Sequence, residues 1–200
     1  MDTKREILAT ALDLFSRAGY EAVGVQQICT SAGITKPSLY YHFSNKETLL
    51  GEVAGDAAVR FLHALVNGPT TGIDTASREV RFSGDLVADI RSLFASVLWF
   101  SRTHPARFQI ILQMLYPPPG SVLGQIGKPE LNRIYASLAQ FFTSAATAHG
   151  NLVGKERFLA IVFVGHAIAL AMFLSNIHDP PNPDSPEVVQ AAQTFLYGVF

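Results

Sequence analysis

Apolar residues recur along this chain every three or four positions, which is the spacing of a helix with one buried face, and no segment alternates convincingly like a strand. Near the N-terminus one such stripe consists of Ile7, Leu8, Ala11, Leu12, Leu14 and Phe15. Gly19 follows this stripe as a stop signal, and Thr3 and Glu6 precede it with the spacing of a capping box. The pattern predicts an all-α protein whose first helix lies between Thr3 and Gly19.

Two short helices and one long helix are predicted next. The second helix covers about residues 26–32 and ends at Gly33, and the third begins after Thr35, whose hydroxyl can cap it. Pro37 suits the first turn of this third helix, where a missing amide proton costs nothing. A second capping box, in which Ser44 would be the cap, opens a fourth helix that reaches about residue 66.

Breaks rich in glycine and proline divide the remainder of the chain into further helices. The helices are expected near residues 85–103, 106–115, 129–149, 155–176 and 186–199. The breaks include residues 67–72, 116–120 and 178–183. Pro129 is suited to a first helical turn and Gly150 to a C-terminal cap.

Residues 32–35 join the second and third helices as a short turn that contains a glycine, the arrangement of a helix-turn-helix. Ile28, Ile34 and Leu39 are expected to face the small core that these helices share with the first one. The other side chains of the third helix can hydrogen-bond or touch methyl groups, as is needed at base edges and phosphates in a major groove. This motif predicts a DNA-binding surface within about residues 25–43.

Charge supports this interpretation only locally. The formal net charge of −1 and the pI near 6.6 make no case for binding nucleic acid through the chain as a whole. Between Ala22 and Lys46, however, there is no Asp or Glu, while Lys36, His42 and Lys46 all lie in that segment. With two lysines, the signal is weak by itself.

The segment from about Thr3 to Leu50 resembles the TetR family of transcriptional regulators. The resemblance is carried by Ile7 to Phe15, Gly19-Tyr20, Ile28, Ala32 to Phe43, and Asn45 to Leu50. It implies a dimer, usually a repressor, whose divergent C-terminal domain binds a small molecule and releases DNA. Cys29 departs from the family, in which alanine is commoner there. The arm before the first helix is very short, which argues against added minor-groove contacts.

The residues expected to bind DNA come from both short helices and the start of the fourth. They are Gln26, Thr35, Lys36, Pro37, Ser38, Tyr40, Tyr41, His42 and Lys46. Lys46 is expected to meet a phosphate, because a helix start offers free amides beside its ammonium and because the resemblance implies a phosphate-binding lysine there. Phe43 is expected in the core, and Cys29 as a small buried hydrophobe rather than a redox sensor.

The C-terminal region is less specific. Positions that could line an apolar effector cavity are Trp99, Phe108, Gln113, Tyr135, Phe163 and His166. The aromatic positions among them are equally compatible with packed core. His166 lies in an apolar helix, so it is either a satisfied core histidine or a hydrogen-bonding group toward the effector. The expected effector is apolar or aromatic and can carry one polar group.

The last two helices carry the expected homodimer surface. Its residues are Gly165, Ala169, Met172, Val188, Val189, Ala192, Phe195 and Leu196. Residues 158–175 contain no Asp, Glu, Lys or Arg, which reaches the lower limit for a membrane span. A helix that is apolar all round is equally suited to burial within protein, and we expect no membrane partner.

Enzymatic chemistry finds little support in the sequence. There is no phosphate-cradling glycine loop, no G-x-S-x-G, no H-E-x-x-H and no EF-hand loop, and the six histidines have no metal-site spacing. Cys29 is the only cysteine, so no internal disulfide is possible and a reducing cytosol is expected. We expect no cofactor and no metal, a cytoplasmic location, and no signal peptide.

The patterns together predict a helix-turn-helix DNA-binding domain over residues 1–45 and an effector-binding and dimerisation domain over residues 46–200. The expected function is that of a ligand-responsive transcriptional regulator, most simply a repressor that a small effector releases from double-stranded operator DNA. One alternative is an all-helical small-molecule-binding protein or enzyme with an apolar pocket. Another is a membrane-associated protein anchored by residues 158–175.

Overall fold

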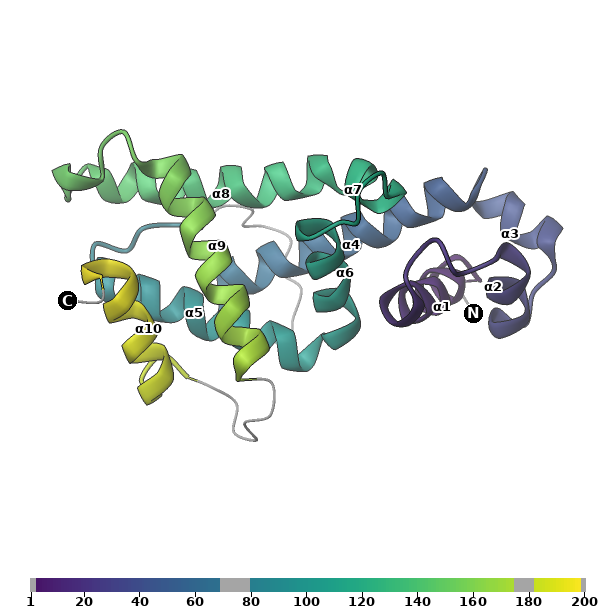
Figure 1. Ribbon diagram of the computed structural model, residues 1–200, viewed down its shortest axis with the longest axis horizontal. Helices are drawn as coiled ribbons and strands as arrows, with labels where there is room; N and C mark the ends of the chain where they lie inside the picture. The colour runs from purple at the N-terminus through teal and green to yellow at the C-terminus, as the bar shows by residue number, and fades with distance from the viewer. Residues whose placement is uncertain (1–2, 69–79, 175–181, 199–200) are drawn as a thin grey trace. The chain divides into compact units, whose positions relative to one another are not determined.

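The computed structural model describes residues 3–68, 80–174 and 182–198. Over these residues the chain forms α-helices and one short 3-10 helix, and no strand is present among them, so the all-α prediction is confirmed (Figure 1). Most of the predicted breaks at residues 67–72 and 178–183 lie outside the described residues.

The helices group into two compact units. The N-terminal unit consists of Met1–Val59 and Pro105–Asn132, and the C-terminal unit of Arg60–His104 and Arg133–Phe200. Two helices, α4 (Lys46–Asn67) and α8 (Lys128–Ala146), contribute residues to both units. The N-terminal unit therefore holds α6 (Pro105–Leu115) and α7 (Val122–Ile126) in addition to the helix-turn-helix, while the functional boundary at residue 45 stays a prediction.

The core of the N-terminal unit forms where α1 (Thr3–Ala18), α2 (Val25–Ala32) and α3 (Lys36–His42) meet. α1 packs on α2 and on α6. Ile28 and Leu39 are fully buried, as predicted, and Ile34 is half-buried. Cys29 and Phe43 are also buried, which confirms their assignment to the core. Burying a side chain of the size of leucine or phenylalanine stabilises such a unit by about 1.5–3 kcal/mol.

Two predicted helix caps are displaced in the structure. α4 is capped by Asn45 rather than Ser44, because the Asn45 Oδ1 atom accepts a hydrogen bond from the backbone N–H of Thr48 at 2.7 Å. The Ser44 hydroxyl instead shares a 2.9 Å hydrogen bond with that of Thr48. Thr3 is already helical, so the first capping box is displaced as well. Ser and Asn are both good caps, and their neighbours decide which one is used.

In the C-terminal unit, α5 (Leu86–Thr103), α9 (Glu156–Phe173) and α10 (Pro186–Tyr197) pack on one another. Their shared core is rich in aromatic rings: the Phe94 ring centroid lies 4.9 Å from that of Phe163, and Phe163 lies 5.7 Å from Phe195. Tilted and edge-to-face pairs of this kind add to the free energy of apolar burial. The sequence pattern predicted these three helices to within about three residues at each end, and their packing shows why they carry so many phenylalanines.

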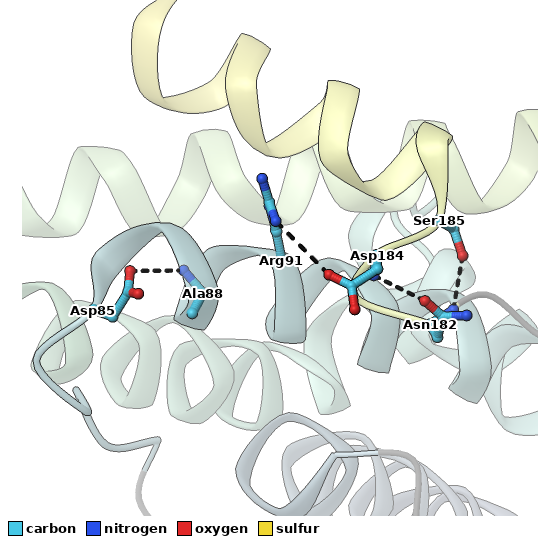
Figure 2. Close-up of polar contacts among 6 residues, drawn as sticks. All are labelled: Asp85, Ala88, Arg91, Asn182, Asp184 and Ser185. Atoms are coloured by element: carbon cyan, nitrogen blue, oxygen red, sulfur yellow. Dashed lines mark hydrogen bonds and ion pairs between the residues drawn. The ribbon is translucent and has the colours of Figure 1, made fainter.

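Polar side chains fix the ends of these helices. Figure 2 shows Asp85, whose carboxylate accepts from the backbone N–H of Ala88 at 3.0 Å and caps α5. It also shows Arg91 of α5 in a 3.8 Å ion pair with Asp184, just before α10. The Arg102 guanidinium donates to the carbonyl of Leu174 at 3.1 Å and so covers the end of α9. The hydrogen bonds of Asp85 and Arg102 give partners to backbone groups at helix ends, and the ion pair balances the charge of Asp184 beside the start of α10.

Other boundaries differ from those expected. α8 ends at Ala146, and Gly150 begins the 3-10 helix η1 (Gly150–Leu152) instead of capping a helix that reaches residue 149. The helix α7 was not predicted. It is five residues long and starts at Ser121, whose hydroxyl accepts from the N–H of Gly124 at 3.0 Å. A helix this short has no periodic apolar stripe, so the sequence pattern could not show it.

Candidate functional site

The turn between α2 and α3 depends on one glycine and one threonine. Gly33 adopts a φ of 66°, in the left-handed region that favours glycine. The N–H of Ile34 donates to the carbonyl of Cys29 at 3.0 Å, which closes α2. The Thr35 hydroxyl accepts from the N–H of Ser38 at 3.4 Å, which opens α3. The turn and the start of the third helix are therefore as predicted.

On the side away from the core, α3 presents a polar and aromatic surface. Lys36, Pro37 and Tyr40 are exposed, and Tyr41 is 85% exposed. Gln26 of α2 and Thr35 in the turn are exposed as well, whereas Ser38 and His42 are half-buried. The His42 ring meets that of Tyr41 edge to face, with centroids 5.0 Å apart. A large aromatic side chain with a hydroxyl, held almost fully in solvent, is suited to a partner that is both polar and apolar.

Lys46 is placed differently from the other predicted DNA-binding residues. Its ammonium donates to the carbonyls of Tyr20 at 3.0 Å and Val23 at 2.9 Å, both in the connection between α1 and α2. The same nitrogen lies 3.9 Å from the centroid of the Tyr20 ring. Lys46 is half-buried, and most of its hydrogen-bonding capacity is used inside the protein. Its expected phosphate contact stays a prediction.

Two of the predicted effector-binding residues belong to the N-terminal unit. The Gln113 side-chain amide of α6 donates to the carbonyls of Phe15 and Ser16, each at 3.2 Å, near the end of α1. Phe108 is buried. Gln113 therefore holds α6 to α1, and its NH₂ group already has two acceptors.

The other four predicted effector-binding residues belong to the C-terminal unit. Phe163 is fully buried, and His166 is half-buried with its ring centroid 5.0 Å from that of Phe94. Burial lowers the pKa of His166 below its usual value, because the neutral imidazole is favoured over the charged form where solvent is partly excluded. Tyr135 and Trp99 are half-buried, and the Trp99 ring lies 5.5 Å from that of His104. Phe163 and His166 thus both pack against the ring of Phe94. Their role in effector binding stays a prediction.

The outer face of α9 was only partly anticipated from the sequence. Its exposed apolar side chains are Phe158, Ile161, Val162, Met172 and Phe173. Gly165 and Ala169 complete the stripe at helical spacing. In contrast, Val188 and Ala192 of α10 are fully buried, so these two residues are not available for the dimer surface to which the sequence assigned them. The sequence signal for this exposed apolar face was the run without charged residues from residue 158. A helix with only one buried face would be expected to carry polar residues on its other side.

Among the described residues, α9 is also the one helix that is long and apolar enough to cross a membrane by length and composition. A single helix of this kind does not by itself indicate a membrane span, because core helices of soluble proteins have the same length and composition. The same part of the chain contains no group of three or more His, Cys, Asp or Glu side chains that could hold a metal ion.

A three-helix core with a glycine turn and an exposed third helix defines a helix-turn-helix protein. Residues 7–53 match the family described as bacterial regulatory proteins, tetR family. This segment of the chain, which contains the helix-turn-helix, is therefore similar to that family.

A curated relative, the HTH-type transcriptional regulator AcrR of Shigella flexneri, is 24% identical over 115 residues, which cover 58% of this chain and 48% of that protein. The chain spans about half the length of this relative, and about a fifth of the next ones.

Two solved structures share the fold over nearly the whole chain. FadR from Bacillus subtilis, in complex with stearoyl-CoA, has a TM-score of 0.71 at 14% identity and covers 98% of this chain and 99% of its own. AibR, in complex with isovaleryl coenzyme A and operator DNA, has a TM-score of 0.66 at 18% identity and covers all of both chains. At these identities the likeness establishes the fold.

Proposed function

We propose that this protein is a ligand-responsive transcriptional regulator that binds double-stranded operator DNA as a homodimer in the cytoplasm, and is not an enzyme. The observation that carries the proposal is the exposed face of α3, where Lys36 and Tyr41 project beside the glycine turn of a segment that matches the tetR family. Proteins of the same fold bind acyl-CoA and operator DNA, which supports a ligand response. The simplest form is a repressor that its effector releases.

The proposed DNA contacts divide into two kinds. Lys36, Ser38 and Tyr41 on α3 reach base edges, where Lys36 donates to guanine acceptors and Tyr41 touches a thymine methyl or a phosphate. Gln26, Thr35, Pro37, Tyr40 and His42 surround them and hold the register on the backbone. Since the net charge is −1, affinity depends on this local surface.

The test is fluorescence anisotropy of the purified protein on two labelled duplexes. One duplex is selected from random sequences by the protein itself, and the other is a scrambled duplex of the same composition. We expect selective binding that weakens steeply with salt. Failure to select any sequence, or equal affinity for both duplexes at every salt concentration, would contradict the proposed function.

The homodimer is proposed on the basis of the α9 face. Its exposed residues, among them Phe158 and Phe173, which are 66% and 84% exposed, form one continuous stripe along the helix. Apolar patches of this extent on a soluble protein mark interaction sites. A two-fold axis through this face would bring two copies of α9 together, and a site read by two recognition helices needs half-sites about 34–36 Å apart. The proposed interface buries more than about 2,000 Å² in total.

The effector is proposed to be apolar or aromatic with one polar group, and to bind among the four predicted residues that belong to the C-terminal unit, which are Trp99, Tyr135, Phe163 and His166. The C-terminal unit offers aromatic rings around Phe163 and the neutral imidazole of His166 as a hydrogen-bonding group. Stearoyl-CoA and isovaleryl coenzyme A are suitable first probes for release of the selected duplex. We expect Trp99→Ala and Phe163→Ala to weaken release while DNA affinity without effector stays nearly unchanged. Tyr116→Ala, at an exposed position, is the matched control.

A further inference from the structure

A small cluster of polar side chains joins the start of α4 to the connection between α1 and α2. Lys46 donates to the carbonyls of Tyr20 and Val23, at 3.0 and 2.9 Å. The next residue, Glu47, accepts a 3.0 Å hydrogen bond from the Tyr20 hydroxyl. Lys46 therefore hydrogen-bonds to the backbone of Tyr20, and the adjacent residue of α4, Glu47, hydrogen-bonds to its side chain. All four residues belong to the N-terminal unit.

Tyr20 is buried, with 5% of its surface exposed, and its ring packs against Phe15 with centroids 5.5 Å apart. It cannot contact DNA from this position. The Lys46 ammonium lies 3.9 Å from the centre of the same ring, so the lysine meets the tyrosine through a cation–π contact as well as a hydrogen bond. An ammonium has three N–H bonds, and two of them already have carbonyl acceptors.

The segment that this cluster holds leads directly into the helix-turn-helix. α2 begins at Val25, and its N-cap residue Gly24 has no side chain to accept a hydrogen bond from the first turn. The carbonyl of Val23, two residues before α2, is held by Lys46. The path of the chain into α2 therefore depends on α4, and α3 follows α2 after the three residues 33–35.

We infer that Lys46 is a positioning residue, which together with Tyr20 and Glu47 fixes α2 and α3 on α4 and so supports sequence-specific DNA binding from inside the protein. This inference rests on the proposed DNA-binding function. It differs from the expectation that Lys46 is a phosphate ligand, because a phosphate contact adds affinity on every sequence, whereas the orientation of α3 matters most where bases are read.

The test uses the full-length protein on the selected and scrambled duplexes, with a salt titration for each. In Lys46→Met we expect affinity for the selected duplex to fall by about tenfold, the size expected from the loss of a charged hydrogen bond. Affinity for the scrambled duplex should change by less than about twofold. The slope of log affinity against log salt concentration on that duplex should change by less than about half a unit. Lys46→Arg, which keeps the donors and the charge, should restore most of the selectivity. Lys155→Met, with the same charge change at an exposed site of the C-terminal unit, is the control.

Tyr20→Phe provides a second, milder variant, because it removes only the hydroxyl that Glu47 accepts and changes no charge. It should lower selectivity in the same direction by a smaller factor, and its effect should shrink when Lys46 is already Met, since the two act through one connection. If the circular dichroism of Lys46→Met shows that this variant does not fold, the effect of Tyr20→Phe on selectivity decides whether the inference stands.

Three outcomes would overturn the inference. In the first, Lys46→Met lowers both affinities by the same factor and reduces the salt slope by about one unit, as a phosphate ligand would. In the second, the Lys46 and Tyr20 effects simply add. In the third, Tyr20→Phe leaves selectivity unchanged. A wild-type protein that selects no sequence would instead contradict the proposed function.

Discussion

The exposed faces of α3 and α9 both carry large side chains in solvent, but of opposite character. On α3 the exposed residues are Lys36, Pro37 and two tyrosines, and the lysine and both tyrosines have a polar group at the end of the side chain. On α9, apart from Arg157 in the first turn, the large ones are phenylalanine, isoleucine, valine and methionine, with no hydrogen-bonding group between Phe158 and Val162. A hydrated polyanion is bound through donors and charge, whereas an apolar face is stabilised by the exclusion of water. This difference supports the proposal that the two faces have different partners, DNA for α3 and a second copy of the chain for α9.

The difference also concerns the helices behind these faces. α3 is seven residues long and is held by a local cap, the glycine turn and one fully buried leucine, so its exposed residues depend on contacts elsewhere in the N-terminal unit. α9 has eighteen residues and packs on α5 and α10, so its outer face has a rigid support of its own. Substitutions on α9 should act directly on the proposed association, whereas substitutions near α3 should act on the proposed DNA binding through both contact and position.

The largest effect is expected on α9. Ile161→Glu places a carboxylate from each copy in the proposed dimer interface, where an unpaired buried charge costs about 3 kcal/mol or more. We expect the dissociation constant of the dimer to rise at least about a hundredfold, giving monomer at micromolar concentration in sedimentation velocity. Thr143→Glu, at an exposed position on α8, should leave the dimer intact. A wild-type monomer at micromolar concentration would remove the basis for the α9 interface.

A smaller effect is expected from the exposed lysine of α3. Lys36→Ala should cost about 1–3 kcal/mol of binding free energy on the selected duplex and much less on the scrambled one, because Lys36 is proposed to donate to bases. Anisotropy titrations on both duplexes measure the difference, with Lys155→Ala as the charge-matched control. If both affinities fall in the same proportion, Lys36 contacts only the backbone.

The contact between α6 and α1 should show as a change in stability. Gln113→Leu removes two hydrogen bonds from the carbonyls of Phe15 and Ser16, and we expect the free energy of unfolding to fall by about 1–2 kcal/mol in urea. Gln140→Leu, at an exposed position of α8, is the control. Unchanged stability combined with a lost effector response would instead support the sequence-based assignment of Gln113 to the effector site.

The smallest effect concerns the pH dependence of stability. Burial lowers the pKa of His166 in the folded protein, so below the usual value of 6.5 the unfolded chain binds this proton more readily than the folded one. The free energy of unfolding should therefore decrease as the pH falls below about 6.5, and this part of the decrease should be absent in His166→Phe. Urea denaturation of both proteins at about pH 7.5 and about pH 5.5 provides the comparison. A larger decrease in the variant would contradict the assignment.

Much of the helix-turn-helix was predictable because its signals are local. A glycine that can adopt a positive φ and a threonine that can cap lie two residues apart, and they determine the turn regardless of the rest of the chain. The burial of Leu39 and the exposure of Lys36 and Tyr41 followed from the helical period, whereas Ser38 and His42 are half-buried although the same period placed them on the outer face. The same reasoning missed α7, and it chose Ser44 over Asn45 because both residue types cap well and differ only in their surroundings.

The roles of Lys46, Gln113 and Val188 could not be read from the sequence. The carbonyls that Lys46 holds lie 26 and 23 residues away, and those that Gln113 holds lie 98 and 97 residues away. No periodicity links positions so far apart. Val188 was assigned to a dimer surface, but it is buried within the chain. The sequence pattern of an apolar residue is the same whether it faces the protein's own core or a second copy.

The sequence by itself determined the all-α class, the helix-turn-helix and the exposure of Lys36 and Tyr41 on α3, because helical period, caps and turn glycines act over a few neighbouring residues. Only the tertiary structure decided which apolar face of α9 is left open, which polar groups are already bonded within the chain, and that α6 belongs with the helix-turn-helix in one compact unit. The physical reason is that burial and hydrogen bonding between distant segments are properties of the packed chain, in which each side chain has one set of neighbours.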